Sequence, residues 1–401
     1  MDAYLLDWAN LLLRFAHVVT AIAWIGSSFY FVLLDNSLTP PVDPEVKKRG
    51  VDGELWAVHG GGFYNQQKYL VAPKALPEHL HWSFWESYST WLTGFGLFTV
   101  LYLFNAGTFL VDKSVYDWSP GAAVAAALGF LVVCWLVYDL ICRAFGQKKN
   151  GDLIVGAGVL IFVIFASWLA CQLFAGRAAF LLVGAMLATT MSANVFFLII
   201  PGQRKVVAQM RAGLPVDPIH GQRGKQRSVH NTYFTLPVVM AMMSNHYGWL
   251  YQGKNNWIVL VLMMLAGALI RHSFVARHKA LAYGKRVPWE QAIVGTLVMA
   301  GLIFWLAPAP PSAAAVAAAS KPVVFAEVKA VIDQRCALCH NAQLQNKNVA
   351  LHTPELIKQH ALAVYQQSSV LRLMPMNNAT QITEEERALI KRWFDAGAPV
   401  N

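Results

Sequence analysis

Charged residues are scarce in this sequence. Asp, Glu, Lys and Arg make up 13% of its 401 residues, whereas a soluble domain carries about 25%. This scarcity excludes a cytosolic enzyme and an intrinsically disordered chain. Cysteine is also rare, with 5 residues, which excludes a small scaffold held together by disulfides. Hydrophobic residues make up 56% of the chain, and the mean hydropathy is +0.41. Much of the chain is therefore expected in an apolar environment.

Eight apolar runs each come close to the roughly 20 residues that a helix needs to cross the hydrocarbon core of a bilayer. Helices are predicted because open strands would leave backbone groups unpaired in lipid. The sequence therefore predicts an all-α fold, with an eight-helix transmembrane bundle over residues 1–308. The predicted spans are residues 9–33, 83–105, 121–142, 153–175, 179–201, 230–251, 256–276 and 289–308.

The basic residues alternate between the two sides of this bundle. The loops on one side hold 18 Lys and Arg residues, and the loops on the other side hold 3, namely Lys113, Arg177 and Lys254. Cytoplasmic loops carry such an excess, so both termini are expected on the side of the membrane that faces away from the cytoplasm. We expect no cleavable signal peptide, because Met1 to Asp7 holds two acids and no base. The net charge of +10 then reflects topology, and nucleic acid is not an expected partner.

Beyond the last apolar run, residues 309–321 are rich in Pro and Ala and predict a linker. Residues 322–401 predict a small polar domain that contains Cys336-Ala-Leu-Cys339-His340. In a C-x-x-C-H motif, two thiols bond the vinyl groups of a haem and the histidine ligates the iron. A redox dithiol or a zinc site would not need a histidine at this place, and no second pair at zinc spacing follows. One covalent haem c is therefore predicted.

The opposite face of the iron needs a second ligand. Met374 and Met376 follow the motif, and Pro375 fixes the chain directly after Met374. We favour Met374, because a Met-Pro pair resembles the ligand loop of small class I cytochromes. His352 and His360 are interpreted as solvated surface residues.

Two helices are predicted to frame this domain. An amphipathic stretch covers Val324 to Gln334, and a final helix covers Glu384 to Ala396. The final helix begins with a Thr383-x-x-Glu386 capping box. These features predict a class I cytochrome c-like domain.

Polar residues at membrane depth indicate function by default. His17 and His246 fall in the outer halves of the first and sixth predicted spans. They are candidate ligands of a membrane haem b, and the alternative for His17 is a buried, hydrogen-bonded histidine. A second polar group gathers at the inner ends of the spans: His81, Glu86, Asp139, His230, Asn231, Thr232, Tyr233, Arg271 and His272.

Four segments carry a family resemblance: Arg14 to His17 with Trp24 to Gly26, His81 to Gly94, Arg227 to Pro237, and Ser244 to Tyr247. With eight spans followed by a c domain, the chain resembles the membrane-bound, cytochrome c-linked urate oxidases (urate hydroxylases) of bacteria. The resemblance implies oxidation of urate to 5-hydroxyisourate. It also implies that water supplies the oxygen and that electrons pass to cytochrome c.

Urate is a planar anion, so its pocket needs a few placed polar groups between apolar walls. We expect this pocket near the inner face, with Glu86 or His81 as general base and His230, Asn231 and Tyr233 as further site residues. The haem c lies beyond the outer face, about 30 Å away across the core. One or two haems b are therefore expected as intermediate carriers, one of them between His17 and His246. The final acceptor would be a soluble cytochrome c or a terminal oxidase.

Other interpretations stay open at this point. Paired histidines would equally serve a quinol-oxidising respiratory cytochrome without purine chemistry. The first span alone also resembles that of membrane porphyrinogen oxidases, although such a protein has no need of a fused cytochrome. The inner loop 34–82, with its run Gly60-Gly61-Gly62, is either a lid over substrate or a simple connection.

Overall fold

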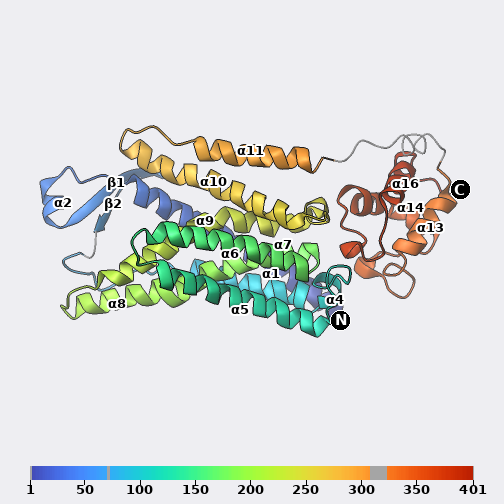
Figure 1. Cartoon of the computed structure of the whole chain (residues 1–401), viewed down its shortest axis with the longest axis horizontal. Coiled ribbons are helices and arrows are strands. Elements are labelled where there is room, and N and C mark those ends of the chain that lie inside the picture. Colours follow the sequence, from blue (N-terminus) through green and yellow to red (C-terminus); the bar gives the residue numbers. More distant parts are fainter. Residues whose placement is uncertain (1, 70–72, 308–322, 401) are drawn as a thin grey trace.

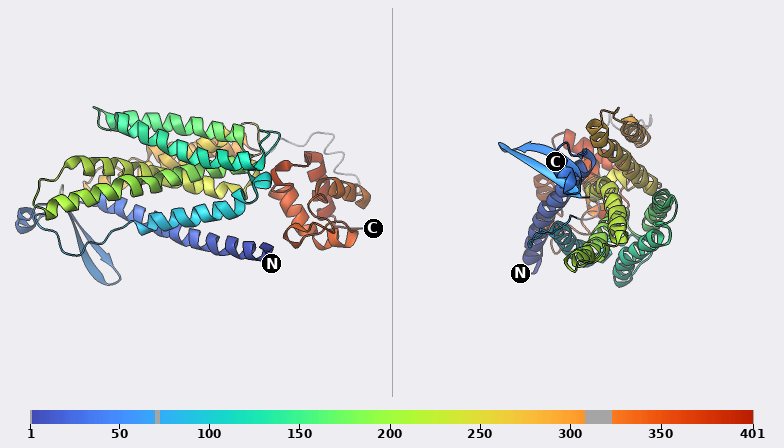
Figure 2. Two further views of the ribbon diagram at one scale, coloured as in Figure 1. Left: turned by 90° about the horizontal axis from the view of Figure 1, so that it is seen from below. Right: turned by 90° about the vertical axis from the view of Figure 1, so that its left-hand side faces the viewer.

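The computed structural model describes residues 2–69, 73–307 and 323–400. Long helices form a bundle, and a small helical domain sits against one end of it (Figure 1). The start of the first helix lies at the same end as this domain (Figures 1 and 2), as expected if both face one side of a membrane. The predicted linker, residues 309–321, lies outside the described residues.

Helix is present in each of the eight predicted spans. Two of the helices contain π-helical turns, η1 and η2, and a third gives way to short 3-10 turns, η3 and η4. The bounds are α1 Asp2–Ser37, α3 Trp85–Phe98 with η1 Thr99–Leu103, α4 Ala106–Phe109, α5 Pro120–Phe145, α6 Gly151–Leu173, α7 Gly176–Ala193 with η2 Asn194–Ile199 and α8 Ile200–Arg211, α9 Pro218–Met243 with η3 Ser244–His246 and η4 Gly248–Leu250, α10 Asn256–Ala282, and α11 Glu290–Trp305.

Five helices of the described chain are long and apolar enough to cross a membrane: Tyr4–Ser37, Pro120–Phe145, Gly151–Leu173, Gly176–Arg211 and Asn256–Ala282. The other three differ in length or composition. Helix α3 has 14 residues and α11 has 16, and the first half of α9 is polar, with Arg223, Lys225 and Arg227. The total of eight crossings therefore stays a prediction.

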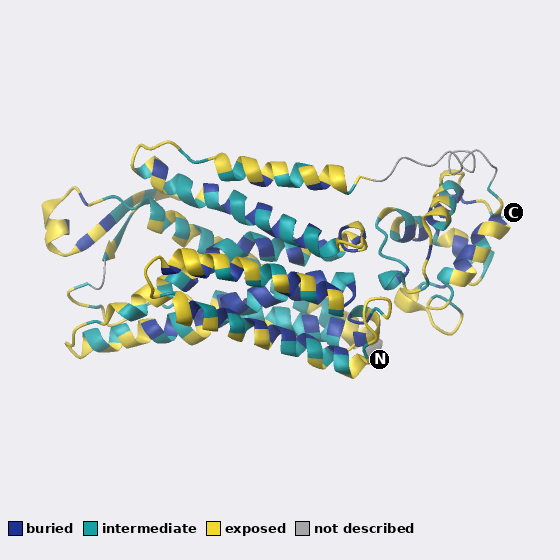
Figure 3. Cartoon of the chain, viewed as in Figure 1, coloured by how far each residue is buried: buried dark blue, intermediate teal, exposed yellow. Residues whose placement is uncertain are grey.

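The bundle exposes apolar side chains on its outer helices. Phe15 and Ile22 of α1 are 69% and 65% exposed, and Phe304 of α11 is 81% exposed. The core lies around α7, where Phe180 and Leu182 are fully buried (Figure 3). Apolar faces of this extent suit contact with lipid, because water would penalise them.

The inner loop contains a feature that the all-α expectation omits. After the short helix α2 (Pro44–Lys48), strands β1 (Val51–His59) and β2 (Gly62–Tyr69) form an antiparallel hairpin. Gly60 and Gly61 form its turn with φ of +57° and +82°, a conformation that glycine adopts without strain. The glycine run is thus a hairpin turn, whose local pairing needs no periodic helical pattern.

The small domain holds α13 (Phe325–Arg335), η5 (Asn346–Asn348), α14 (Pro354–Gln359), α15 (Ala361–Tyr365), η6 (Gln366–Val370), η7 (Met376–Asn378) and α16 (Glu384–Asp395). Helices α13 and α16 share its core, in which Ile332, Ile390 and Trp393 are fully buried. The predicted capping box at Thr383 and Glu386 is confirmed, with both of its hydrogen bonds present. The two predicted framing helices therefore pack against each other.

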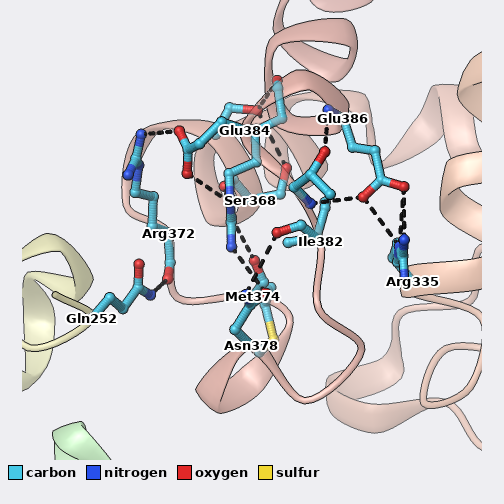
Figure 4. A network of polar contacts seen from close by, with 12 residues as sticks. Gln252, Arg335, Ser368, Arg372, Met374, Asn378, Ile382, Glu384 and Glu386 are labelled. Carbon is cyan, nitrogen blue, oxygen red and sulfur yellow. Dashed lines mark hydrogen bonds and ion pairs between the residues drawn. The ribbon is translucent and has the colours of Figure 1, made fainter. Parts of the chain in front are cut away.

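An ion pair also joins these two helices. Arg335 donates from Nε and Nη2 to the carboxylate of Glu386, at 3.0–3.2 Å (Figure 4). Burial raises the pKa of Glu386, but the bonds from Arg335 and from the Thr383 backbone outweigh burial, so the pKa is lowered below 4.5. A lowered carboxyl pKa stabilises the fold above the ordinary pKa, and this stabilisation is lost as pH falls through the lowered value.

Glu386→Gln should therefore destabilise the small domain at neutral pH by about 1.5–3 kcal/mol, the usual contribution of hydrogen bonds to charged groups. Hydrogen exchange of the α16 amides in the full chain measures this loss. The difference from the unmodified protein should shrink once the pH falls below 4.5. An equal difference at both pH values would show that the charge of Glu386 contributes nothing.

Candidate functional site

A cavity of about 1580 Å³ lies where the bundle meets the small domain. Its lining includes both candidate haem b ligands and two arginines of the bundle, and it also includes the four predicted haem c residues of the small domain. They are Arg14, His17, Arg177 and His246 from the bundle, and Cys336, Cys339, His340 and Met374 from the small domain. The predicted ligands of both haem types therefore open onto one cavity.

His340 is held in one orientation. Its Nδ1 lies 3.0 Å from the carbonyl oxygen of Val349. Because a carbonyl oxygen only accepts, Nδ1 carries the proton and Nε2 keeps its lone pair. A ligating histidine is usually fixed in this way by a hydrogen bond from its other nitrogen. The His340 side chain therefore fits an axial iron ligand.

The thiol chemistry of the motif points the same way. Burial raises the pKa of Cys336 to about 11, so this thiol stays protonated at neutral pH. Redox-active dithiols depend instead on a lowered thiol pKa. Cys336 therefore suits a stable thioether bond better than thiol–disulfide exchange.

The two candidate methionines have different contacts. The backbone of Met374 is held on both sides, since its N–H donates to Gln367 and its carbonyl accepts from Arg387 Nη1, each at 3.0 Å (Figure 4). The sulfur of Met376 instead accepts from Arg177 Nη1 of the bundle at 3.4 Å. This arrangement favours Met374 as the iron ligand and makes Met376 a contact between the domains.

His17 has a similar arrangement within the bundle. Its Nδ1 lies 3.1 Å from the carbonyl oxygen of Thr90 and 3.3 Å from Thr93 Oγ1, which leaves Nε2 as the acceptor. The imidazole lies against Gly94, where a Cβ atom would come within 2.7 Å of His17 Cε1. His246, in η3, lines the same cavity. His17 therefore has the fixed orientation that a haem ligand needs, and His246 opens onto the same space.

A second polar site lies near the inner ends of α5, α7 and α9. His230 Nδ1 and Tyr138 Oη are 2.7 Å apart. Asn194 donates to Tyr138 Oη and to Asn231 Oδ1, each at 3.0 Å. Asn231 in turn donates to the carbonyl oxygen of Met191. We call Tyr138, Asn194, Arg227, His230 and Asn231 the inner network.

Arg227 belongs to this network through Tyr138 and an ion pair. Its guanidinium lies 4.9 Å from the centre of the Tyr138 ring, and its Nη2 is 2.7 Å from Asp139. Within the described residues, Arg227 Nη1 and Asn194 Oδ1 are buried without a hydrogen-bond partner. A buried donor and a buried acceptor left unpaired cost free energy. They are therefore two atoms of the inner network that could still accept and donate a further hydrogen bond.

The other inner candidates lie apart from this network. Tyr233 Oη is 2.7 Å from His272 Nδ1, and the two rings stack. His81 is exposed in the loop before α3, and Glu86 is half-buried in the first turn of α3. Ser87, next to Glu86, donates to Ser192 Oγ of α7 at 3.2 Å. His230 and Asn231, which are consecutive in the chain, thus both belong to the inner network. The serine pair brings α3 close to the end of α7 where Asn194 lies.

The sequence analysis did not select Tyr138 or Asn194. Asn194 lies within the apolar run 179–201, and an amide at membrane depth is costly enough to be a signal. It also begins the π-helical segment η2, and such turns are frequent at functional sites.

An apolar bundle whose histidines share a cavity with a C-x-x-C-H domain has the features of a membrane-associated redox protein. The chain belongs to the family described as "Urate oxidase N-terminal", whose model matches residues 3–307. The match covers the bundle and ends before the small domain. It supports an oxidoreductase that acts on urate. Comparison with curated proteins and with solved structures finds no match.

Proposed function

We propose that this protein is an integral membrane enzyme that oxidises urate to 5-hydroxyisourate. Urate and one water molecule yield the product, two protons and two electrons. The electrons pass singly to a covalent haem c and then to a soluble cytochrome c or a terminal oxidase. Five apolar helices and the basic loops support a place in a bacterial inner membrane, with the small domain in the periplasm.

The observation that carries this proposal is the cavity shared by the two domains. Cys336, Cys339, His340 and Met374 would hold the haem c, and His17 and His246 would hold a haem b. When bound, these haems supply one-electron transfer. The chain itself orients His17 and His340 by hydrogen bonds to Nδ1. Neighbouring binding places in one cavity shorten the distance that an electron has to cross.

For urate, we propose a binding place at the inner network. Urate carries N–H donors and carbonyl acceptors on a planar ring. Asn194 Oδ1 would accept from one of its N–H groups, and Arg227 Nη1 would donate to an oxygen, because both atoms lack partners in the described structure. Such pairing also compensates the anionic charge of the substrate.

The remaining inner residues complete this proposal. His230, Asn231 and Tyr233 would orient urate and the attacking water. Glu86 or His81, at the start of α3, would withdraw a proton from one of them. The contact between Ser87 and Ser192, at 3.2 Å, supports the approach of α3 to the network.

The proposal is tested by adding urate anaerobically to the oxidised, purified full-length protein. The absorption of the c haem should change to that of the reduced state, and His340→Ala should abolish this change. Glu86→Gln should keep the haem spectrum but lose reduction by urate. Glu290→Gln is the matched control, because Glu290 also begins a helix but pairs with Arg286 on the surface.

Two outcomes would contradict the proposal. If quinol reduces the haem and urate does not, the protein is a quinol-oxidising cytochrome. If Glu86→Gln and His81→Ala each respond to urate as fast as the unmodified protein, the proposed bases have no role.

A further inference from the structure

Arg177 occupies an unusual position for a cation. It lies in the first turn of α7, where the helix dipole presents partial positive charge and an arginine is unfavourable. No Asp or Glu pairs with it in the described parts of the chain, and its Nε is buried without a partner. An anion bound at this place would relieve all three costs.

Tyr102 presents a second unpaired donor next to it. This side chain is 3% exposed, and its hydroxyl proton has no acceptor among the described residues. Both side chains pack on Phe109, since the Tyr102 and Phe109 ring centres are 5.4 Å apart and Arg177 Cζ lies 5.5 Å from the Phe109 ring. Both side chains also line the cavity. Arg177 Nε and the Tyr102 hydroxyl are thus adjacent donors that have no acceptor among the described residues, and together they define a site for an oxyanion.

The rest of the cavity indicates which oxyanion this is. Cys336, Cys339 and His340 line the same space, and a porphyrin attached there carries two propionate carboxylates. A carboxylate accepts from a guanidinium and a hydroxyl at the same time. We propose that Arg177 and Tyr102 bind a propionate carboxylate of a porphyrin in this cavity. The inference rests on the proposed function, because it requires that the cavity holds haem.

Other contacts keep the small domain over this site. Arg177 also donates to the Met376 sulfur, and Asn377 donates to the carbonyl oxygen of Thr108 at 2.8 Å. Gln252 donates to the carbonyl oxygen of Arg372. The loop on both sides of Met374 is thus fixed to the bundle, so a porphyrin of the small domain would lie near Arg177.

A cation next to the porphyrin favours the reduced iron, which carries one positive charge fewer than the oxidised iron. Arg177→Gln should therefore lower the midpoint potential of the haem that carries the carboxylate, and Arg177→Lys should restore part of it. Tyr102→Phe should lower the potential by a smaller amount. Lys254→Gln is the matched control, because it removes an exposed positive charge from the same end of the bundle and should leave the potential unchanged.

Spectroelectrochemical titration of the purified full-length protein measures these shifts. The c-type and b-type spectra distinguish which porphyrin carries the carboxylate, and a shift of either supports the inference. An unchanged potential in Arg177→Gln with intact haem overturns it. A second result would also overturn the inference: Arg177→Gln keeps the midpoint potential of the haem but needs several-fold more urate for half-maximal reduction. The anion bound by Arg177 would then be urate.

The failure of the proposed function would look different. A protein without covalent haem, or one that urate never reduces, would contradict the proposed function before any variant is compared. If Arg177→Gln does not fold, Tyr102→Phe keeps the test, because it removes one oxygen and leaves the ring packing on Phe109 in place.

Discussion

Gly94→Ala should eliminate haem b from the protein and leave covalent haem c in place. A Cβ atom at position 94 would stand 2.7 Å from Cε1 and 3.0 Å from Nδ1 of His17, and Cβ atoms in proteins essentially never come within 3.0 Å of another heavy atom in this way. The imidazole would have to leave its hydrogen bond to Thr90, and Nε2 would lose its direction. A pyridine haemochrome spectrum counts both haem types in the same sample.

Gly129→Ala is the matched control for this prediction. Gly129 lies inside helix α5, and a Cβ atom there would meet nothing within 4 Å. Alanine also favours helix over glycine, so this variant should keep both haems. A Gly94→Ala protein with a full complement of haem b would show that His17 is not its ligand.

A double variant, Cys336→Ser with Cys339→Ser, should lose covalent haem and reduce urate turnover with an external acceptor to background. The reason is that both thioether bonds to the porphyrin disappear, and with them the proposed exit for electrons. Urate added anaerobically should still reduce haem b, because the bundle keeps His17 and His246. Stopped-flow absorption separates the two events.

Cys134→Ala together with Cys171→Ala serves as its control. Both thiols are buried in the bundle, in α5 and α6, and neither should affect haem content. Full turnover by the double serine variant would show that electrons leave without the small domain, and would limit the enzyme to its bundle.

Local signals in the sequence predicted the helices well. Apolar runs of sufficient length located a helix in every predicted span, and the Thr383-x-x-Glu386 pattern predicted a capping box that the structure confirms. Helix ends were less predictable. Helix α9 begins at Pro218, twelve residues before the predicted apolar run. Its first turns are polar, and a polar helix can extend into water without exposing apolar side chains.

Contacts between distant segments could not be predicted in the same way. The inner network joins Tyr138, Asn194 and His230 from three helices, and no spacing along the chain indicates such a meeting. The hairpin at Gly60 and Gly61 was missed because its two strands are largely exposed or half-buried and do not alternate regularly between apolar and polar residues. The contact of Met376 likewise could not be predicted, because its partner Arg177 lies far away in the sequence.

Helix α7 is one continuous α-helix that runs between the two ends of the bundle. Arg177 stands in its first turn, and Asn194 follows its last residue, Ala193, about 26 Å away at 1.5 Å per residue. A ligand at Asn194 that shifted α7 along its axis would move the Arg177 guanidinium relative to Met376 at the other end of the helix. Under the proposed function, urate binding at the inner network and the reduction potential of the haem would then be coupled through the backbone of α7.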